Sequence, residues 1–268
     1  MSGALQIGPL SVPFELLLVF AAVGSGSLVG SRLGRKLGVD ADPALFRLLL
    51  VALIASRLSF VLRFHEAYSA APLGILDIRD GGWSPLGGIV AAWACLLVLA
   101  WLRRTLARPV GAALATATGG WLLGTMILAT WPAEALQIPV VKLASPQGQE
   151  VLLSEFHGKP VVVNLWATWC PPCQRELPIL EQAQTERPDV HFVFLNQGEA
   201  AETVNSFLVA RYPGLRNVLL DIEGSVSASF GQRALPTTLF FDAHGKLVST
   251  RIGELSRATL AQRLDALP

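Results

Sequence analysis

The sequence predicts two unlike parts, an all-α bundle of about four transmembrane helices in residues 1–131 and an α/β domain in residues 132–268. The chain has 268 residues, of which 52% are hydrophobic and only 15% are charged, so it is too apolar to be wholly soluble. Apolar residues crowd the first half, whereas charged residues, turns and alternating strand patterns fill the second. We therefore expect the boundary between the two domains near Trp131-Pro132.

Four stretches of the first half are long and apolar enough to be membrane-spanning helices, since about 20 residues cross a hydrocarbon core of about 30 Å. They lie near Pro13–Val29, Ala44–Leu62, Leu86–Leu102 and Val110–Trp131. Glycines and threonines dilute the last stretch, and membrane helices tolerate these residues where they pack closely. Residues 1–10 carry no basic start of the kind a secretory signal has, so we expect the first helix to stay attached.

The connecting loops predict how these helices cross the membrane. The first loop holds Arg32, Arg35 and Lys36 and then Arg47, and the third holds Arg103, Arg104 and Arg108. The second loop mixes Arg63 and Arg79 with Glu66, Asp77 and Asp80. Cytoplasmic loops carry an excess of Lys and Arg. We therefore expect a multi-pass protein of the bacterial inner (cytoplasmic) membrane with residues 132–268 in the periplasm. Alternatively, the basic residues are only solvated helix ends.

The chain contains three cysteines, Cys95 inside the third apolar stretch, and Cys170 and Cys173 in the second half. A four-cysteine zinc site is therefore out of reach for one chain, and the histidines show no paired ligand spacing, so we expect no metal. The net charge of +1 gives no indication of nucleic acid as a partner. The two neighbouring cysteines are the most informative feature of the sequence.

The cysteine pair lies where a strand ends and a helix begins. The apolar run Pro160–Trp166 predicts a buried central strand, and Gln174–Gln184 alternates apolar and polar residues at helical spacing. A helix N-terminus favours thiolate over thiol at the nearer cysteine. Two intervening residues bring both sulfurs within bonding reach, so this spacing predicts reversible thiol-disulfide exchange. The alternative, an inert structural disulfide, closes too small a loop to stabilise a fold much.

The position of each residue suggests its role in such an exchange. Cys170, nearer to solvent, would attack or be attacked, and Cys173 would resolve the mixed disulfide. Pro171 and Pro172 would stiffen the turn. Trp169 would shield the sulfurs, or else simply pack into the core. We expect no cofactor beyond the redox-active disulfide Cys170–Cys173.

The segment Val163–Cys173, followed by Glu176-Leu177-Pro178, resembles the TlpA-like branch of the thioredoxin fold, whose members are membrane-tethered periplasmic reductases. The resemblance spans roughly Ile138 to Leu267. It implies an α/β thioredoxin fold with a TlpA-like insertion, client proteins with disulfides or thiols as partners, and a membrane thiol electron donor. Asn164 stands where thioredoxins usually carry a buried Asp, so a carboxylate relay at that position is absent and a hydrogen-bonded core amide is expected.

The same resemblance assigns the remaining segments. Leu235, Pro236 and Thr237 look like the loop that carries the family's cis proline beside the disulfide, where the backbone of Leu235 would pair with a substrate chain. An ordinary proline at the start of a strand is the alternative. The inserted strand and helix, the hairpin turn between the last strands and the closing helix are expected at Asn196–Leu220, Asp242–Lys246 and Arg257–Leu267, respectively.

The first half resembles the early half of prolipoprotein diacylglyceryl transferases, in Ala55–Leu62 and again from Pro72 to Gly88. That family usually has a histidine before the paired glycines, and Leu86 stands there instead. The family's later Gly-Arg-Leu-Gly-Asn segment has no counterpart. We therefore interpret residues 1–131 as a truncated relative that has lost transferase activity, because Leu cannot act as a base. Arg57 and Asp80 would be retained as contacts to a loop or to a lipid headgroup, and snorkelling and solvation explain them equally well.

These observations leave several functions open. We expect a reductase of client disulfides, with a thiol oxidase of the same fold as the alternative, since sequence does not fix the direction of exchange. A transferase, or a unit that binds membrane lipid or a lipoprotein, is the alternative for the first half. That half has Cys95 as its single cysteine, so it cannot pass electrons across the membrane through a dithiol of its own. Reducing power must therefore come from a separate partner.

Overall fold

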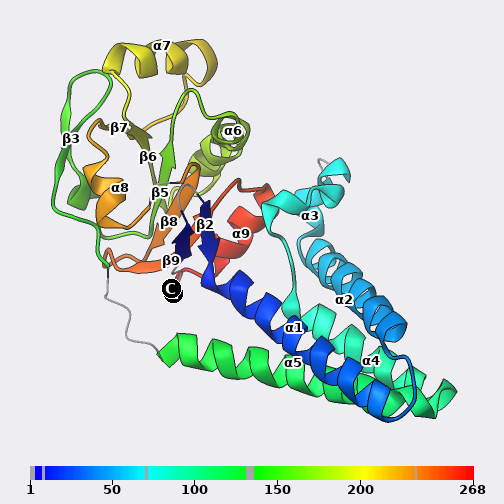
Figure 1. Cartoon of the computed structure of the whole chain (residues 1–268). Helices are drawn as coiled ribbons and strands as arrows, with labels where there is room; N and C mark the ends of the chain where they lie inside the picture. The colour runs from blue at the N-terminus through cyan, green and yellow to red at the C-terminus, as the bar shows by residue number, and fades with distance from the viewer. Residues whose placement is uncertain (1–3, 8–9, 70–71, 131–135, 233) are drawn as a thin grey trace. The chain divides into compact units, whose positions relative to one another are not determined.

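The computed structural model of the chain describes residues 4–7, 10–69, 72–130, 136–232 and 234–268 (Figure 1). These residues belong to two compact units, one within residues 12–131 and one within residues 132–268 together with residues 1–11. The boundary expected near Trp131-Pro132 lies outside the described residues.

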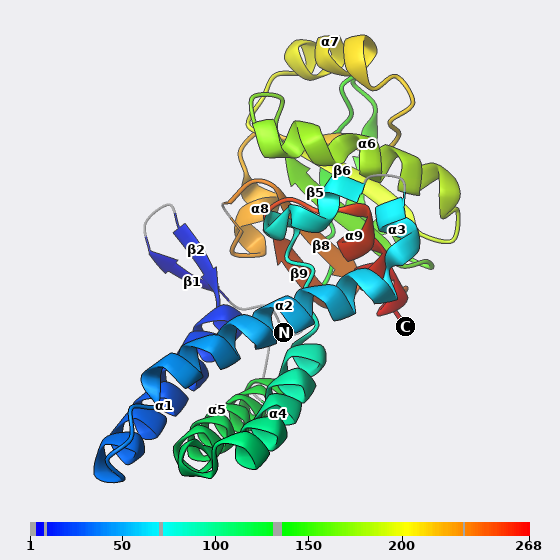
Figure 2. The same ribbon diagram turned by 90° about the vertical axis from the view of Figure 1, so that its right-hand side faces the viewer.

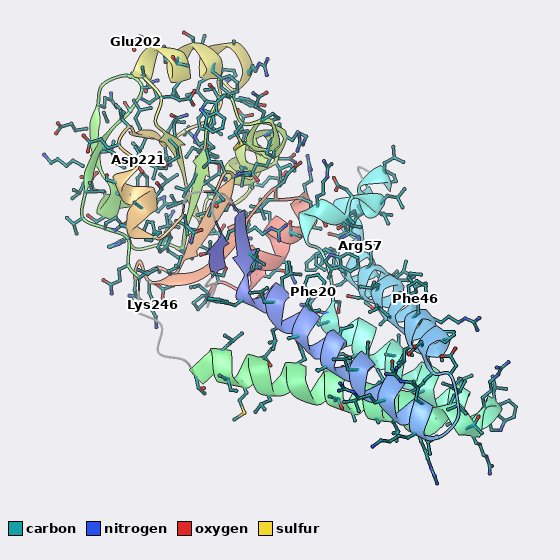
Figure 3. All side chains as sticks on the ribbon, in the orientation of Figure 1. Phe20, Phe46, Arg57, Glu202, Asp221 and Lys246 are labelled. Atoms are coloured by element: carbon teal, nitrogen blue, oxygen red, sulfur yellow. A yellow bond between two sulfur atoms is a disulfide. The ribbon has the colours of Figure 1, made fainter. Side chains whose placement is uncertain are left out.

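Four long helices form the first unit, and each is long and apolar enough to cross a membrane. They are α1 (Phe14–Lys36), α2 (Asp42–Arg63), α4 (Pro85–Leu102) and α5 (Arg104–Thr130). The four predicted helices are thus confirmed, but α1 runs seven residues beyond the expected end at Val29, because Arg and Lys continue a helix as readily as apolar residues do. Large apolar side chains such as Phe20 and Phe46 point outward, as lipid-facing residues would (Figure 3).

Small residues let the helices of this unit approach one another closely. Helix α1 packs along α5, and α2 packs along α4. A Cβ atom placed on Gly30 of α1 would lie 2.8 Å from the Cβ of Ala113 and 3.1 Å from the carbonyl oxygen of Pro109, both in α5. Such contacts leave no room for a side chain, so glycine allows this helix pair to form.

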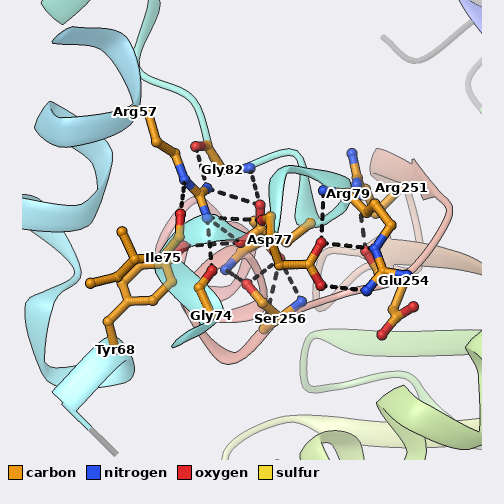
Figure 4. A network of polar contacts seen from close by, with 12 residues as sticks. Arg57, Tyr68, Gly74, Ile75, Asp77, Arg79, Gly82, Arg251, Glu254 and Ser256 are labelled. Atoms are coloured by element: carbon orange, nitrogen blue, oxygen red, sulfur yellow. Dashed lines mark hydrogen bonds and ion pairs between the residues drawn. The ribbon is translucent and has the colours of Figure 1, made fainter. Parts of the chain in front are cut away.

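Three short helices lie between α2 and α4, namely α3 (His65–Ser69), η1 (Pro72–Leu76) and η2 (Ile78–Asp80). They are held by Arg57, which is buried near the end of α2 (Figure 4). Its guanidinium donates to the Asp80 carboxylate at 2.9 Å. Its other acceptors are backbone carbonyl oxygens of Gly74, Ile75, Asp77 and Gly82. These bonds occupy all five N–H donors of the side chain, and the Tyr68 hydroxyl also donates to Asp80.

The Arg57 contacts decide between the two roles expected for this residue. A guanidinium whose donors are all taken by the loop has none left for a lipid phosphate. Arg57 and Asp80 are therefore loop contacts, and they connect α2 to the segment that leads into α4.

The C-terminal unit is built on a mixed seven-stranded sheet in the order β4-β3-β7-β6-β5-β8-β9. The strands are β3 (Lys142–Ala144), β4 (Glu150–Leu152), β5 (Val161–Trp166), β6 (His191–Gln197), β7 (Val218–Asp221), β8 (Thr237–Phe241) and β9 (Leu247–Ile252). Strand β5 is central and fully buried, parallel to β6 and antiparallel to β8, which confirms the predicted central strand. A separate two-stranded sheet joins β1 (Ala4–Ile7) and β2 (Leu10–Pro13) (Figure 2).

Helices cover both faces of the seven-stranded sheet, as expected for a thioredoxin fold. Alternate residues of β5 point to opposite faces, Val162 and Trp166 to one core cluster, Val163 and Leu165 to the other. The first cluster lies under α6 (Pro171–Glu186), α7 (Ala201–Arg211) and α9 (Arg257–Asp265). The second lies under α8 (Ser225–Ser229) and the 3₁₀ turn η3 (Leu153–Phe156). Both cysteines of the pair belong to the first cluster.

The segments expected around this core are present. Helix α7 and strand β7 form the inserted pair between β6 and β8, and α9 closes the unit. The turn between β8 and β9 is held by Asp242, whose carboxylate accepts the backbone N–H groups of His244 and Lys246, each at 2.9 Å. Gly245 adopts a φ of +76°, which glycine allows without strain. The predicted hairpin is thereby confirmed.

The Arg57 network predicts that Arg57→Leu destabilises the membrane unit. The change leaves the buried Asp80 carboxylate without its cation, and breaking a buried pair typically costs about 3–5 kcal/mol. Thermal unfolding of the detergent-solubilised chain should show a clear loss. Arg57→Lys should recover only part of it, because an ammonium has three donors rather than five. Arg47→Leu, at an exposed position of the same helix, is the matched control and should change little. Equal stability of the Arg57→Leu and Arg47→Leu variants would contradict the role assigned to Arg57.

Candidate active site

The cysteine pair lies at the junction of the central strand and the helix that follows it. Strand β5 ends at Trp166 and α6 begins at Pro171, so the expected position between strand and helix is what the fold provides. Cys170 is the N-cap residue of α6, and its Sγ accepts the backbone N–H of Cys173 at 3.3 Å. The two sulfurs are joined as a disulfide, with Cα atoms 5.3 Å apart. The sulfur of Cys170 thus lies at the positive end of the helix dipole.

The residues around the pair differ sharply in exposure. Cys170 is 3% exposed and Cys173 is fully buried, so Cys170 carries the outer sulfur. Trp169 is 67% exposed, which rules out the alternative that it packs into the core. Pro171 and Pro172 occupy the first turn of α6, where a missing N–H costs no helical hydrogen bond.

The loop before β8 completes the set of residues expected from the sequence. The peptide bond Leu235-Pro236 is cis. Leu235 packs against the apolar cluster that contains both cysteines. Thr237 begins β8 opposite Leu165 of β5, and its hydroxyl donates to the carbonyl oxygen of Ala234 at 2.7 Å. The fold therefore brings this loop to the same core as the disulfide.

One buried carboxyl group was not among the residues expected at the site. Glu176 lies on α6 three residues after Cys173, so both share one face of the helix, and both are fully buried. Its Oε1 accepts the side-chain N–H of Asn164 at 2.7 Å, and its Oε2 accepts the backbone N–H of Leu255 at 2.9 Å. Burial raises the pKa of Glu176 to about 7, from an ordinary value near 4.5. Both protonation states of this carboxyl are thus accessible near neutral pH.

Asn164 is one of the two hydrogen-bond donors that hold the buried carboxyl of Glu176. It lies on β5 and donates to Glu176 and to the hydroxyl of Thr238 at 3.0 Å, as the hydrogen-bonded core amide that we expected. Strand β5 has an amide rather than a carboxylate at position 164, and helix α6 places the carboxyl of Glu176 against that amide. A sequence signal existed, because Glu176 stands on the apolar face of α6, among Cys173, Leu177 and Leu180. An acidic residue on a buried face needs a partner and is often functional.

The rest of the described chain offers few groups for a cofactor. Among the described residues, no three His, Cys, Asp or Glu side chains gather into a metal site. Cys95, in α4, is partly exposed and free. Leu86, which stands where the transferases usually have histidine, is 70% exposed at the start of the same helix.

The two halves of the chain match two different protein-family models. Residues 133–265 match the Redoxin family model, and residues 2–129 match the model of prolipoprotein diacylglyceryl transferase. The thiol-disulfide oxidoreductase ResA of Halalkalibacterium halodurans is 32% identical over 123 residues, which cover 45% of this chain and 69% of that protein. The thioredoxin-like protein YneN of Bacillus subtilis is 30% identical over 135 residues, 49% of this chain and 79% of that protein.

Among solved structures, a secreted disulfide oxidoreductase of Mycobacterium tuberculosis is similar, with 27% identity and a TM-score of 0.44 over 48% of this chain and 96% of that one. The ResA and YneN matches both exceed two thirds of the relative's length. The chain therefore belongs, through its C-terminal unit, to the thiol-disulfide oxidoreductases of the thioredoxin fold, and its residues 2–129 are similar to prolipoprotein diacylglyceryl transferase.

Proposed function

We propose that the C-terminal unit reduces disulfides of client proteins through Cys170 and Cys173, and that a separate membrane thiol donor returns the pair to its reduced form. The single observation that carries this proposal is the Cys170 sulfur at the N-cap of α6, where it accepts the N–H of Cys173. A helix N-terminus stabilises a thiolate, which is the attacking form of the sulfur.

The exchange runs in two steps. The Cys170 thiolate attacks a client disulfide, one Cys170–client S–S bond forms, and the other client sulfur leaves as a thiolate. The Cys173 thiol then gives its proton to the Glu176 carboxylate and attacks the Cys170 sulfur. This closes the Cys170–Cys173 disulfide and releases the second client sulfur. Two electrons pass from the pair to the client, and no cofactor beyond the disulfide is required.

Each neighbouring residue supports one part of this scheme. The loop of Leu235 and Pro236 receives the client chain, with the backbone of Leu235 as the pairing edge. Thr237 anchors that loop to the start of β8. Trp169, exposed beside the buried pair, shields the sulfurs when a client binds. A reductase is favoured over a thiol oxidase by the TlpA-like segment around the cysteines.

The membrane region plays a second part in the proposal. Its four apolar helices and its family match associate the chain with a membrane. We place it in the bacterial inner membrane, with the C-terminal unit in the periplasm. Cys95 is its single cysteine, so the donor must be another protein. Transferase activity is disfavoured because Leu86 replaces the usual base, whereas a role in binding membrane lipid or a lipoprotein agrees with the family match.

The assigned roles predict which variant captures clients. Cys173→Ser should accumulate mixed disulfides with client proteins, because no resolving thiol remains to release them. Cys170→Ser should accumulate none, because the outer nucleophile is lost. Non-reducing electrophoresis of the purified full-length variants, each mixed with a disulfide-containing protein of known sequence, gives the readout. Equal capture by both variants, or by neither, would refute the assignment.

Glu176 predicts a pH dependence of the second step. With a pKa of about 7, the carboxylate form that accepts a proton grows as the pH rises from 6 to 8. Release of a preformed mixed disulfide should therefore speed up over this range. Glu176→Gln should be slower at pH 8 by at least about tenfold, the low side of what a general base contributes, and should lack the inflection near pH 7. An unchanged pH profile in Glu176→Gln would exclude Glu176 as the base.

The same group links the stability of the unit to pH. The folded pKa is raised, so the folded state holds its proton while the unfolded state loses it near pH 4.5. The free energy of unfolding therefore falls between about pH 4.5 and pH 7 by about 3 kcal/mol, and then levels off. Hydrogen exchange of the β5 amides measures this free energy of unfolding at each pH. In Glu176→Gln the fall between about pH 4.5 and pH 7 should be absent.

The placement in the membrane predicts opposite outcomes for two reporter fusions. Alkaline phosphatase, which needs an oxidising compartment to mature, should be active when fused after Pro268 and inactive when fused in the loop between α1 and α2. The positive charges of that loop keep it cytoplasmic. The reverse pattern would overturn the proposed orientation.

A further inference from the structure

The inserted segment between β6 and β7 contacts the turn that carries the cysteines. Glu199 lies just before α7, and its carboxylate reaches Thr168, two residues before Cys170. Oε2 accepts the backbone N–H of Thr168 at 2.7 Å, and Oε1 accepts the Thr168 hydroxyl. Oε2 also accepts the side-chain N–H of Asn196 at 2.7 Å. Three donors thus converge on one carboxylate.

The carboxylate of Glu199 points to the active-site turn, although it lies close enough to the start of α7 to cap that helix. An acidic residue next to a helix start commonly caps the free N–H groups there. The N-cap residue of α7 is Ala200, and no side chain among the described residues caps the helix. Both carboxylate oxygens of Glu199 instead accept hydrogen bonds from Thr168 and Asn196. Glu199 therefore fixes the active-site turn rather than the start of α7.

The other end of α7 holds the opposite flank of the same turn. Gln174 directly follows Cys173, and its side-chain amide donates to the carbonyl oxygen of Thr168 at 2.5 Å. Arg211 donates to the Gln174 side-chain oxygen at 3.0 Å, and the Tyr212 hydroxyl donates to its backbone oxygen at 2.9 Å. The N–H, the hydroxyl and the carbonyl of Thr168 are therefore all held, and α7 connects the two anchors.

We propose that Glu199 is a positioning residue for disulfide exchange: by fixing Thr168 it holds the turn from which the Cys170 sulfur attacks. Glu199 contacts the turn and not the sulfur in any described bond, so it acts through Thr168. Displacement of a reacting group by about 1 Å can slow a reaction about a hundredfold. The inference rests on the proposed use of Cys170 as the attacking sulfur.

Two substitutions of Glu199 separate its geometry from its charge. In Glu199→Gln the amide oxygen can still accept from Thr168 N–H and Asn196, and its NH₂ group can donate to the Thr168 hydroxyl, which then accepts. Glu199→Ala removes all three contacts. Glu202→Ala is the matched control, because Glu202 lies exposed on the first turn of the same helix (Figure 3).

The test measures how fast the reduced, full-length protein in detergent reduces a disulfide-bonded fluorescent peptide, per mole of folded protein. We expect Glu199→Ala to lower the second-order rate constant at least tenfold, and Glu199→Gln and Glu202→Ala to stay within twofold of the wild type. Rescue by Gln is the readout that separates positioning from charge, and normalisation to folded protein removes simple loss of stability. A rate within twofold of wild type for Glu199→Ala, or equal losses for Ala and Gln, overturns the inference.

A milder variant keeps the test decisive if Glu199→Ala does not fold. Thr168→Val has nearly the same shape and removes only the hydroxyl contact, so we expect a two- to fivefold lower rate, and an unchanged rate contradicts the inference. Cys170→Ser, measured alongside, tests the proposed function separately. Peptide reduction that survives Cys170→Ser refutes the use of Cys170, whatever the Glu199 variants do.

Discussion

The redox site depends on one interaction, the hydrogen bond that the Cys170 sulfur accepts at the start of α6. This sulfur accepts the N–H of Cys173, so the peptide dipoles of the helix stabilise negative charge on the outer sulfur. One turn further along the helix, Cys173 is fully buried and shares a face of α6 with the buried Glu176. The two cysteines therefore differ in position, with the Cys170 sulfur outside at the helix N-terminus and the Cys173 sulfur buried inside.

The surrounding fold keeps this junction in place from several directions. Asn164 on β5 and the backbone of Leu255 hold Glu176. Glu199, just before α7, holds one flank of the turn, and Arg211, at the end of α7, contacts Gln174 of α6, which holds the other. A similar network holds the loop of the membrane unit. There the buried guanidinium of Arg57 donates to four backbone carbonyl oxygens and one carboxylate. In both units, buried polar groups that hydrogen-bond to loops and turns organise the irregular segments.

The sequence was sufficient wherever local chemistry decides the structure. The strand-to-helix junction was predicted from the spacing of the two cysteines, the apolar run before them and the helical pattern after them. The turn between β8 and β9 was predicted from the residues Asp242 to Lys246 that form it. The contacts of Glu176 and Glu199 could not be predicted in this way. Their partners lie 12, 79 and 31 residues away in the chain, and only the packing of helices on the sheet brings them together. The exposure of Trp169 was likewise decided by packing, since its sequence neighbours are equally consistent with a buried side chain.

If Cys170 and Cys173 form a reducing pair, as we propose, their redox state in living cells will show it. Rapid acid quenching followed by thiol-specific alkylation separates the two forms by mass, and equilibration of the purified chain with a thiol buffer gives the potential. We predict a mostly reduced pair with a potential nearer to that of thioredoxin, about −270 mV, than to that of DsbA, about −120 mV. A mostly oxidised pair of high potential would contradict it and would identify a disulfide-forming enzyme instead.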